Sequence, residues 1–115
     1  MSLFKEERPW GIFEVLLDEV ACKVKKITVN PGARLSLQSH TKRCEHWVVT
    51  EGKMRITVGD EVYDVTVNDH AYIPKASKHR IENTTNKPAV LIEIQTGEYF
   101  GEDDIIRYED DYNRV

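Results

Sequence analysis

The sequence predicts an all-β fold, a sandwich or a barrel built from short strands. From Cys22 onward, runs rich in Val, Ile, Thr and Tyr alternate with turn residues at intervals of about ten residues. No segment keeps a helical repeat of apolar residues over several turns. In addition, Gly59-Asp60 joins two such runs, and Gly at the first central position is typical of a two-residue type II′ hairpin.

Eight strands follow from this pattern. Asn30-Pro31-Gly32 ends the first of them and Glu51-Gly52 ends the third, because these residue types are typical of tight turns. The expected strands are residues 23–29, 34–40, 45–50, 54–58, 61–67, 70–74, 79–83 and 89–97.

The acidic C-terminal tail, residues 98–115, is expected to differ from the rest. Gly101 precedes acidic residues whose charges would stabilise the first turn of a helix, so we predict a short helix within residues 101–112. The segment also holds two isoleucines and two tyrosines. We therefore expect it to pack on the barrel and cover a strand edge.

Length and charge exclude several classes of protein. The 115 residues are expected to form one domain, residues 1–115, with one core. The formal net charge is −4, and the tail alone holds seven acidic residues and two arginines, so a basic nucleic-acid-binding stripe is not expected. No apolar run approaches the ~20 residues that cross a bilayer, and the N-terminus has no apolar signal segment. We expect a soluble cytoplasmic chain in which Cys22 and Cys44 are free thiols, with one disulfide as the alternative.

Potential metal ligands are concentrated in residues 38–47, QSHTKRCEHW. Side chains alternate along a strand, so Gln38 and His40 share one face, and Glu45 joins them if it faces inward from the next strand. His79 begins a later strand. Two imidazoles, a carboxylate and an amide oxygen would then converge, a set that suits Zn²⁺, Mn²⁺, Fe²⁺ or Ni²⁺ better than Cu⁺.

Two spaced patterns resemble the two cupin motifs. Residues 32–52 are similar to G(x)5HxH(x)3-4E(x)6G, with Gln38 at the first histidine. Residues 68–83 are similar to G(x)5PxG(x)2H(x)3N, with Asn68 and Ala76 at the two glycine positions. The resemblance implies a double-stranded β-helix, or jelly-roll barrel. It also implies a set of four metal ligands, which would be Gln38, His40, Glu45 and His79.

Longer strings resemble the C-terminal domain of type II phosphomannose isomerases, in order and over nearly the whole chain. They are RPWG (8–11), KKITVNPGARLSLQSH (25–40), RCEHWVV (43–49), IPKASKHRIEN (73–83) and IEIQTGEYFGEDDIIRYEDDY (92–112). In those bifunctional enzymes this domain follows a mannose-1-phosphate guanylyltransferase domain. The resemblance implies metal-dependent interconversion of mannose 6-phosphate and fructose 6-phosphate, with Zn²⁺ as the first expectation for the metal and Mn²⁺, Fe²⁺, Ni²⁺ or Co²⁺ as alternatives.

The sequence departs from that family at two points. Thr41 and Lys42 stand where two further histidines are common, which affects the substrate pocket rather than the four ligands. The chain also has no nucleotidyltransferase domain and no Gly-rich nucleotide loop, so no guanylyltransferase activity is expected from it.

The resemblance suggests roles for individual residues. Arg43 stands at the arginine of the family string QxHxxRxEHW, which is regarded as important for isomerase activity, so it is the leading catalytic candidate. Arg80 is a second candidate, and Glu93 or Glu82 is a candidate general base. Both arginines have a structural alternative as ordinary ion-pair partners of Glu45 and Glu82.

Other residues receive simpler interpretations. Lys42, Lys75 and Lys78 are candidate phosphate ligands, because an ammonium group is a point charge for a phosphate; the alternative is a solvated surface. Trp10 and Trp47 are expected to anchor the core. His46 and His70 are expected to be structural.

Two other functions stay open at this stage, because cupin folds host many chemistries. One is a non-catalytic module that binds a sugar phosphate or sugar nucleotide beside a separate guanylyltransferase. The other is a different cupin enzyme, such as an Fe²⁺ dioxygenase or a sugar epimerase, although Gln38 at the first histidine makes the dioxygenase less attractive. A homodimer is expected, because cupins often pair through strand exchange or sheet packing.

Overall fold

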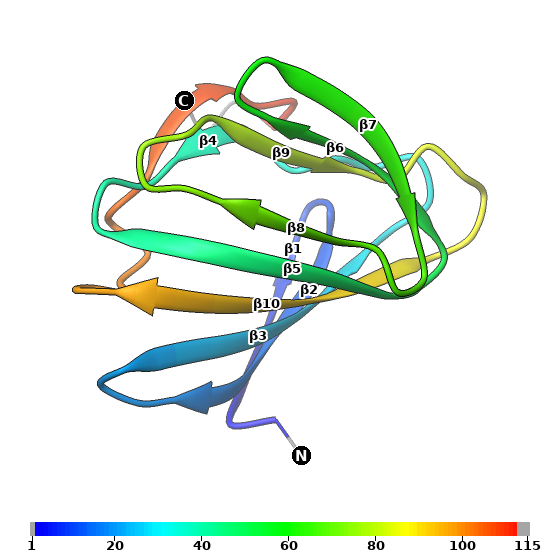
Figure 1. Ribbon diagram of the computed structural model, residues 1–115. Helices are drawn as coiled ribbons and strands as arrows, with labels where there is room; N and C mark the ends of the chain where they lie inside the picture. The colour runs from blue at the N-terminus through cyan, green and yellow to red at the C-terminus, as the bar shows by residue number, and fades with distance from the viewer. Residues whose placement is uncertain (1, 113–115) are drawn as a thin grey trace.

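A computed structural model describes residues 2–112 and contains only strands and loops in that range (Figure 1). Two antiparallel sheets face each other. The larger has the strand order β1-β2-β3-β10-β5-β8 and the smaller has the order β11-β4-β9-β6-β7. The strands are β1 (Phe4–Arg8), β2 (Gly11–Asp18), β3 (Cys22–Val29), β4 (Leu37–Ser39), β5 (Arg43–Glu51), β6 (Lys53–Val58), β7 (Glu61–Thr66), β8 (His70–Ile73), β9 (His79–Glu82), β10 (Ala89–Gly97) and β11 (Ile106–Glu109).

The all-β prediction is confirmed, and each of the eight expected strands has a counterpart. The strand expected at 34–40 is shorter, because Arg34 makes only an isolated bridge to Glu82 before β4 begins. The hairpin between β6 and β7 is confirmed: Val58 pairs with Glu61, and Gly59 has a φ of 61°. The sequence interpretation did not name β1 and β2, which form one end of the larger sheet.

The predicted helix in the tail is wrong. Residues 106–109 form β11, which pairs antiparallel with β4 at the edge of the smaller sheet. The backbone of β4 offers unpaired groups at that edge, and pairing with them outweighs the local preference of the acidic residues. The expectation that the tail packs on the barrel is confirmed for its described part, while residues 113–115 lie outside the described residues.

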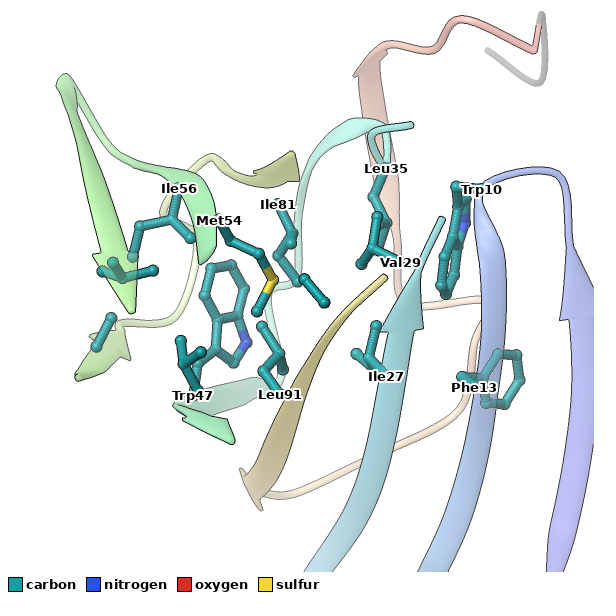
Figure 2. Close-up of a cluster of buried hydrophobic side chains, with 14 of the residues drawn as sticks. Trp10, Phe13, Ile27, Val29, Leu35, Trp47, Met54, Ile56, Ile81 and Leu91 are labelled. Atoms are coloured by element: carbon teal, nitrogen blue, oxygen red, sulfur yellow. The ribbon is translucent and has the colours of Figure 1, made fainter. Parts of the chain in front are cut away.

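The core lies between the two sheets. Figure 2 shows Trp47 close to Met54, Ile81 and Leu91, while Trp10 lies with the residues of β2 and β3. Both tryptophans are buried, as expected for core anchors. Cys22 and Cys44 are free, and the described residues include no helix with the length and apolar composition needed to cross a bilayer.

The end of β10 lies tightly against the segment between β4 and β5. Gly97 has a φ of 143°, and a Cβ at this position would lie 2.4 Å from the carbonyl oxygen of Lys42. Only glycine fits both the backbone conformation and this close approach. The contact holds the first residue of β5, Arg43, beside β10.

Candidate metal centre and its pocket

Three potential metal ligands converge between the sheets. His40 follows β4, Glu45 lies on β5 and His79 begins β9; all three are almost completely buried. One ligand atom from each lies within 4.8 Å of the others. His40 Nδ1 lies 3.5 Å from Glu45 Oε2, and His79 Nε2 lies 3.9 Å from Glu45 Oε1.

The strand pattern explains this convergence. Along β5 the side chains of Arg43, Glu45 and Trp47 are buried while the residues between them are less buried, because the strand period is two. On the smaller sheet, Gln38 of β4 pairs directly with His79 of β9, so both side chains leave the same face. Gln38 lines the same cavity as His40, and its Oε1 accepts a hydrogen bond from Ser36 Oγ at 3.3 Å.

The protonation of the two histidines suits a cation. His79 donates from Nδ1 to the carbonyl oxygen of Ser77 at 3.0 Å, which leaves Nε2 with its lone pair toward Glu45. Burial lowers the pKa of His79. The pKa of His40 is lowered to about 3, first by burial and then by the positive charge of Arg43. Both rings are therefore neutral at pH 7, the form that binds metals.

Two ring nitrogens in this group lack partners. Within residues 2–112, His40 Nδ1 and His79 Nε2 are buried and make no hydrogen bond. Such buried polar atoms are costly unless they are satisfied. His79 already has an unprotonated Nε2 that can bind a cation. His40 can offer a ring nitrogen to a cation by giving up its Nε2 contact with Arg43 or its Nδ1 contact with Glu45. The residues present therefore fit a divalent cation.

A layer of hydrogen bonds orients the carboxylates. Arg43 donates from Nε to Glu45 Oε2 at 2.9 Å. Trp47 Nε1 lies 3.0 Å from Glu45 Oε1 and 3.1 Å from Glu93 Oε1, and it donates to both. Gln95 Nε2 donates to Glu93 Oε2 at 2.7 Å. Burial, followed by the charge of Glu45, raises the pKa of Glu93, so this carboxyl is a candidate for taking up and returning a proton.

A cavity of about 80 Å³ lies beside His40. Its apolar walls include Trp10, Phe13 and Ile27, and its polar lining is rich in charge. Four cationic side chains and two carboxyls line it: Arg8, Lys25, Arg43, Arg107, Glu93 and Glu102.

Sequence reasoning missed Lys25, although a signal was present. In the strand expected at 23–29, Lys25 shares a face with Lys23, Ile27 and Val29, so period two places a charge directly beside two large apolar residues. The structure shows that Lys25 is only 4% exposed. A buried lysine requires a counter-charge and marks a functional candidate.

Several candidates lie elsewhere. Arg80 leaves β9 on the face opposite His79; its Nε donates to the carbonyl oxygen of Leu35 at 3.0 Å and its Nη1 donates to Glu109 at 3.1 Å. The expected partner of Arg80, Glu82, instead contacts Arg34 at 3.4 Å. The structure therefore does not bring Arg80 or Glu82 to the cavity.

The three lysines proposed for phosphate also lie away from the cavity. Lys42 lies over the ring of Tyr99 at 5.2 Å, and Lys78 over the ring of Tyr108 at 4.3 Å. Lys75 is 44% exposed and lies 3.8 Å from Glu98. All three are surface residues, in agreement with the structural alternative for them.

His46 and His70 are also exposed, and neither belongs to the group of potential metal ligands. The ring of His46 packs on that of Tyr72, with 4.8 Å between centroids. Both residues remain structural in our interpretation.

Comparison with known proteins supports the resemblance. The profile of the family described as "Mannose-6-phosphate isomerase C-terminal" matches residues 3–110. The xanthan biosynthesis protein XanB of Xanthomonas campestris strain B100 is 49% identical over 96% of this chain, and the alginate biosynthesis protein AlgA of Pseudomonas aeruginosa is 49% identical over 94%. The mannose-1-phosphate guanylyltransferase ManC of Salmonella typhimurium is 44% identical over 94%. These matches cover 24%, 22% and 22% of the relatives, so the chain spans about a quarter of their length or less.

Solved structures support the fold. Oxalate decarboxylase from Bacillus subtilis superposes with a TM-score of 0.80 at 21% identity, over 93% of this chain and 31% of that one. A protein with a double-stranded β-helix domain from Klebsiella pneumoniae gives a TM-score of 0.74 at 18% identity, over 84% and 83% of the two chains. At these identities the likeness shows the fold alone. The fold is thus the predicted double-stranded β-helix of the cupins.

Proposed function

Because the chain belongs to the family of mannose-6-phosphate isomerase C-terminal domains, we propose that it is a metal-dependent isomerase that interconverts mannose 6-phosphate and fructose 6-phosphate. One observation carries the proposal: His40, Glu45 and His79 converge within 4.8 Å of one another beside a cavity lined by Lys25 and Arg43. In this proposal residues 1–115 act as one cupin domain, with the two motifs supplying opposite sides of the site.

The reaction moves a proton between two adjacent carbons of the sugar. Removal of the proton from C2 of the open-chain aldose gives an enediolate with negative charge on O1. Transfer of the O2 proton to O1 and return of a proton to C1 then give the ketose. Gln38, His40, Glu45 and His79 would hold a divalent cation, which supplies Lewis-acid stabilisation of that charge. The mixed nitrogen and oxygen ligands make Zn²⁺ the first choice, with Mn²⁺, Fe²⁺, Ni²⁺ and Co²⁺ as alternatives.

Arg43 is the proposed electrostatic catalyst. The guanidinium is 4% exposed, and the nearby carboxylates of Glu45, Glu93 and Glu102 outweigh the effect of burial and raise its pKa, so it stays charged. Its Nε and Nη2 are used by Glu45 and His40. The Nη2 nitrogen becomes available to a substrate oxygen when His40 gives up this contact to bind the cation, whereas Nη1 faces the carboxylate of Glu102. A fixed donor of this kind at a developing oxyanion contributes about 10²–10³ in rate.

Glu93 is the proposed proton carrier. It lines the cavity, its raised pKa makes it a better base than an ordinary carboxylate, and Trp47 and Gln95 hold both of its oxygens in place. Glu45 is less suited to the role, because Arg43 and a bound cation both draw on its negative charge. Arg80 is not part of this mechanism because it lies on the other face of β9.

A binding role without turnover is the second candidate. The cavity of about 80 Å³ is smaller than the roughly 300–1,000 Å³ usual for small-molecule sites, which favours a module that only engages part of a sugar phosphate. Such a module would work beside a separate guanylyltransferase, the activity in the name of the relative ManC. The homodimer and the cytoplasmic location stay predictions.

One experiment separates the two candidates. The untagged protein is analysed for bound metal, stripped with chelator, reloaded with Zn²⁺ or Mn²⁺, and assayed for fructose 6-phosphate formation from mannose 6-phosphate. The isomerase predicts turnover that chelation abolishes and metal restores. Stabilisation by mannose 6-phosphate without any turnover would instead favour the binding module.

A further inference from the structure

We propose that Lys25 and Arg43 form the site for the phosphate group of the substrate, and that the carboxylate of Glu102 occupies this site until the phosphate displaces it. The identity of the ligand as a sugar phosphate rests on the proposed function. The anion site itself rests on the contacts of Lys25, Arg43 and Glu102.

Lys25 is fixed on the rigid part of the fold. It lies on β3, between β2 and β10, and pairs across the sheet with Val15 on one side and Glu93 on the other. Its ammonium group lies 4.5 Å from the centre of the Phe13 ring. Glu93 and Lys25 therefore share one face of the sheet, and both line the cavity.

The counter-charge of Lys25 comes from a loop. Glu102 contacts the Lys25 ammonium directly, and its second carboxylate oxygen lies 3.9 Å from Arg43 Nη1. The Glu102 side chain is 44% exposed, whereas the side chains of Lys25 and Arg43 are 5% and 4% exposed. Lys25 and Arg43 are thus buried within the barrel, whereas Glu102 contacts them from the side that is exposed to solvent.

The loop that carries Glu102 joins β10 to β11 and is hydrogen-bonded to the β4–β5 segment near both of its ends. At its start the backbone NH of Glu98 donates to the carbonyl oxygen of Lys42 at 2.9 Å. At its end Asp104 accepts hydrogen bonds from Thr41 Oγ1 at 2.9 Å and from the backbone NH of Lys42 at 3.0 Å. Neither anchor uses the side chain of Glu102, so displacement of that side chain breaks neither contact.

Charge and position both support displacement. Burial alone would raise the pKa of Glu102, but Lys25 and Arg43 outweigh it and the pKa is lowered, so Glu102 is an anion at neutral pH. A phosphate monoester carries up to two negative charges and more acceptor oxygens, so it is a better partner for two cations. Glu102 lines the cavity of about 80 Å³, so a phosphate group that enters between Lys25 and Arg43 takes the place of its carboxylate.

The test is isothermal titration of the full chain with mannose 6-phosphate, inorganic phosphate and mannose as separate probes. Lys25→Met, which keeps the apolar stem, should weaken mannose 6-phosphate binding at least tenfold. Glu102→Gln should tighten it about three- to tenfold, since the competing charge is gone. The matched controls are Lys5→Met and Glu98→Gln, two exposed side chains that do not line the cavity, and they should bind as the wild type does.

The outcomes separate this inference from the proposed function. If Glu102→Gln binds both phosphate probes no more tightly than wild type, or if folded Lys25→Met binds them as well as wild type, the anion site is refuted even when the protein turns over mannose 6-phosphate. If the two variants shift phosphate affinity as expected but no turnover occurs, the result supports the anion site and contradicts the proposed isomerase activity. Inorganic phosphate binding that matches mannose 6-phosphate assigns the affinity to the phosphate group, and binding of mannose alone at equal strength overturns the proposal.

Discussion

Arg43 donates from Nε to Glu45 Oε2 across 2.9 Å, and both side chains are almost completely buried. This pair joins the proposed metal ligands to the proposed electrostatic catalyst, because Arg43 also donates to His40 Nε2 at 3.0 Å. A change at Arg43 therefore has two consequences: loss of a donor for the reaction, and a buried carboxylate left without its partner.

Substitution of Arg43 should separate these consequences. Arg43→Lys keeps a positive charge but loses the two-nitrogen fork, so we expect kcat/KM to fall about 10²–10³-fold with the protein still folded. Arg43→Ala should lower activity at least as far and also lower the free energy of unfolding by about 3 kcal/mol. Arg55→Ala is the control, because Arg55 pairs with exposed Asp64 on the surface. Wild-type activity in Arg43→Lys would contradict this role.

Glu93→Gln should reduce turnover without harming the fold. The substitution keeps the shape but removes the group proposed to move the proton, so kcat should fall about 10²–10⁴-fold while KM changes little. The amide oxygen can still accept from Trp47, and Gln95 has to turn its own amide so that its oxygen accepts from the new NH2 group. Because burial raises the pKa of Glu93, loss of its charge should not by itself lower the melting temperature. Steady-state kinetics and thermal unfolding check both statements. A proportional rise in KM with unchanged kcat would mean that Glu93 binds substrate rather than carrying a proton.

Metal binding should stabilise the protein through the two histidines. Added Zn²⁺ should raise the melting temperature of chelator-stripped protein, by a free energy of about 2.7 kcal/mol at a hundredfold excess over the dissociation constant. His79→Asn should lose this shift, because it removes the Nε2 that faces Glu45. His46→Asn should retain it, since His46 is exposed on the outer face of β5. An equal shift in both variants would place the metal elsewhere.

Stability of the metal-free protein should fall on acidification. The pKa of His40 is about 3 in the folded chain, against an ordinary value of 6.5 for an exposed histidine, so the unfolded chain takes up the proton first as pH falls. The contribution of His40 to the free energy of unfolding is then fully present above pH 6.5 and is lost progressively between pH 6.5 and 3. Between pH 7.5 and 5.5 this loss is about 1–1.5 kcal/mol. Urea unfolding with chelator present measures the slope. His40→Gln should flatten it and His46→Gln should not; an unchanged slope in His40→Gln would show that His40 is not buried in neutral form.

The sequence predicted those parts of the site that depend on local periodicity. Period two along residues 43–49 places Glu45 and Trp47 inside and His46 outside, and the structure agrees. Period two also places Lys25 on a buried face. The role of this charge cannot be inferred, however, until its partner Glu102, 77 residues later, is known. Non-local contacts decide such cases.

The wrong or displaced expectations have the same cause. The tail was expected to form a helix from its local charges, yet the free edge of β4 draws residues 106–109 into β11. Arg80 was a candidate because it alternates with Glu82 on the same sheet. Period two already places it on the face opposite His79, and its distant partner, the carboxylate of Glu109 in β11, holds it on that outer face. Neither the strand edge nor the partner is visible in a local stretch of sequence.

The central claim is tested most directly by proton NMR of mannose 6-phosphate in D₂O with the chelator-stripped and the metal-reloaded protein. We predict that fructose 6-phosphate signals grow and deuterium enters at C2 of mannose 6-phosphate or C1 of fructose 6-phosphate only with the reloaded protein, and that Arg43→Lys slows both. Fully metal-loaded, folded protein that leaves mannose 6-phosphate unchanged and undeuterated would contradict the isomerase.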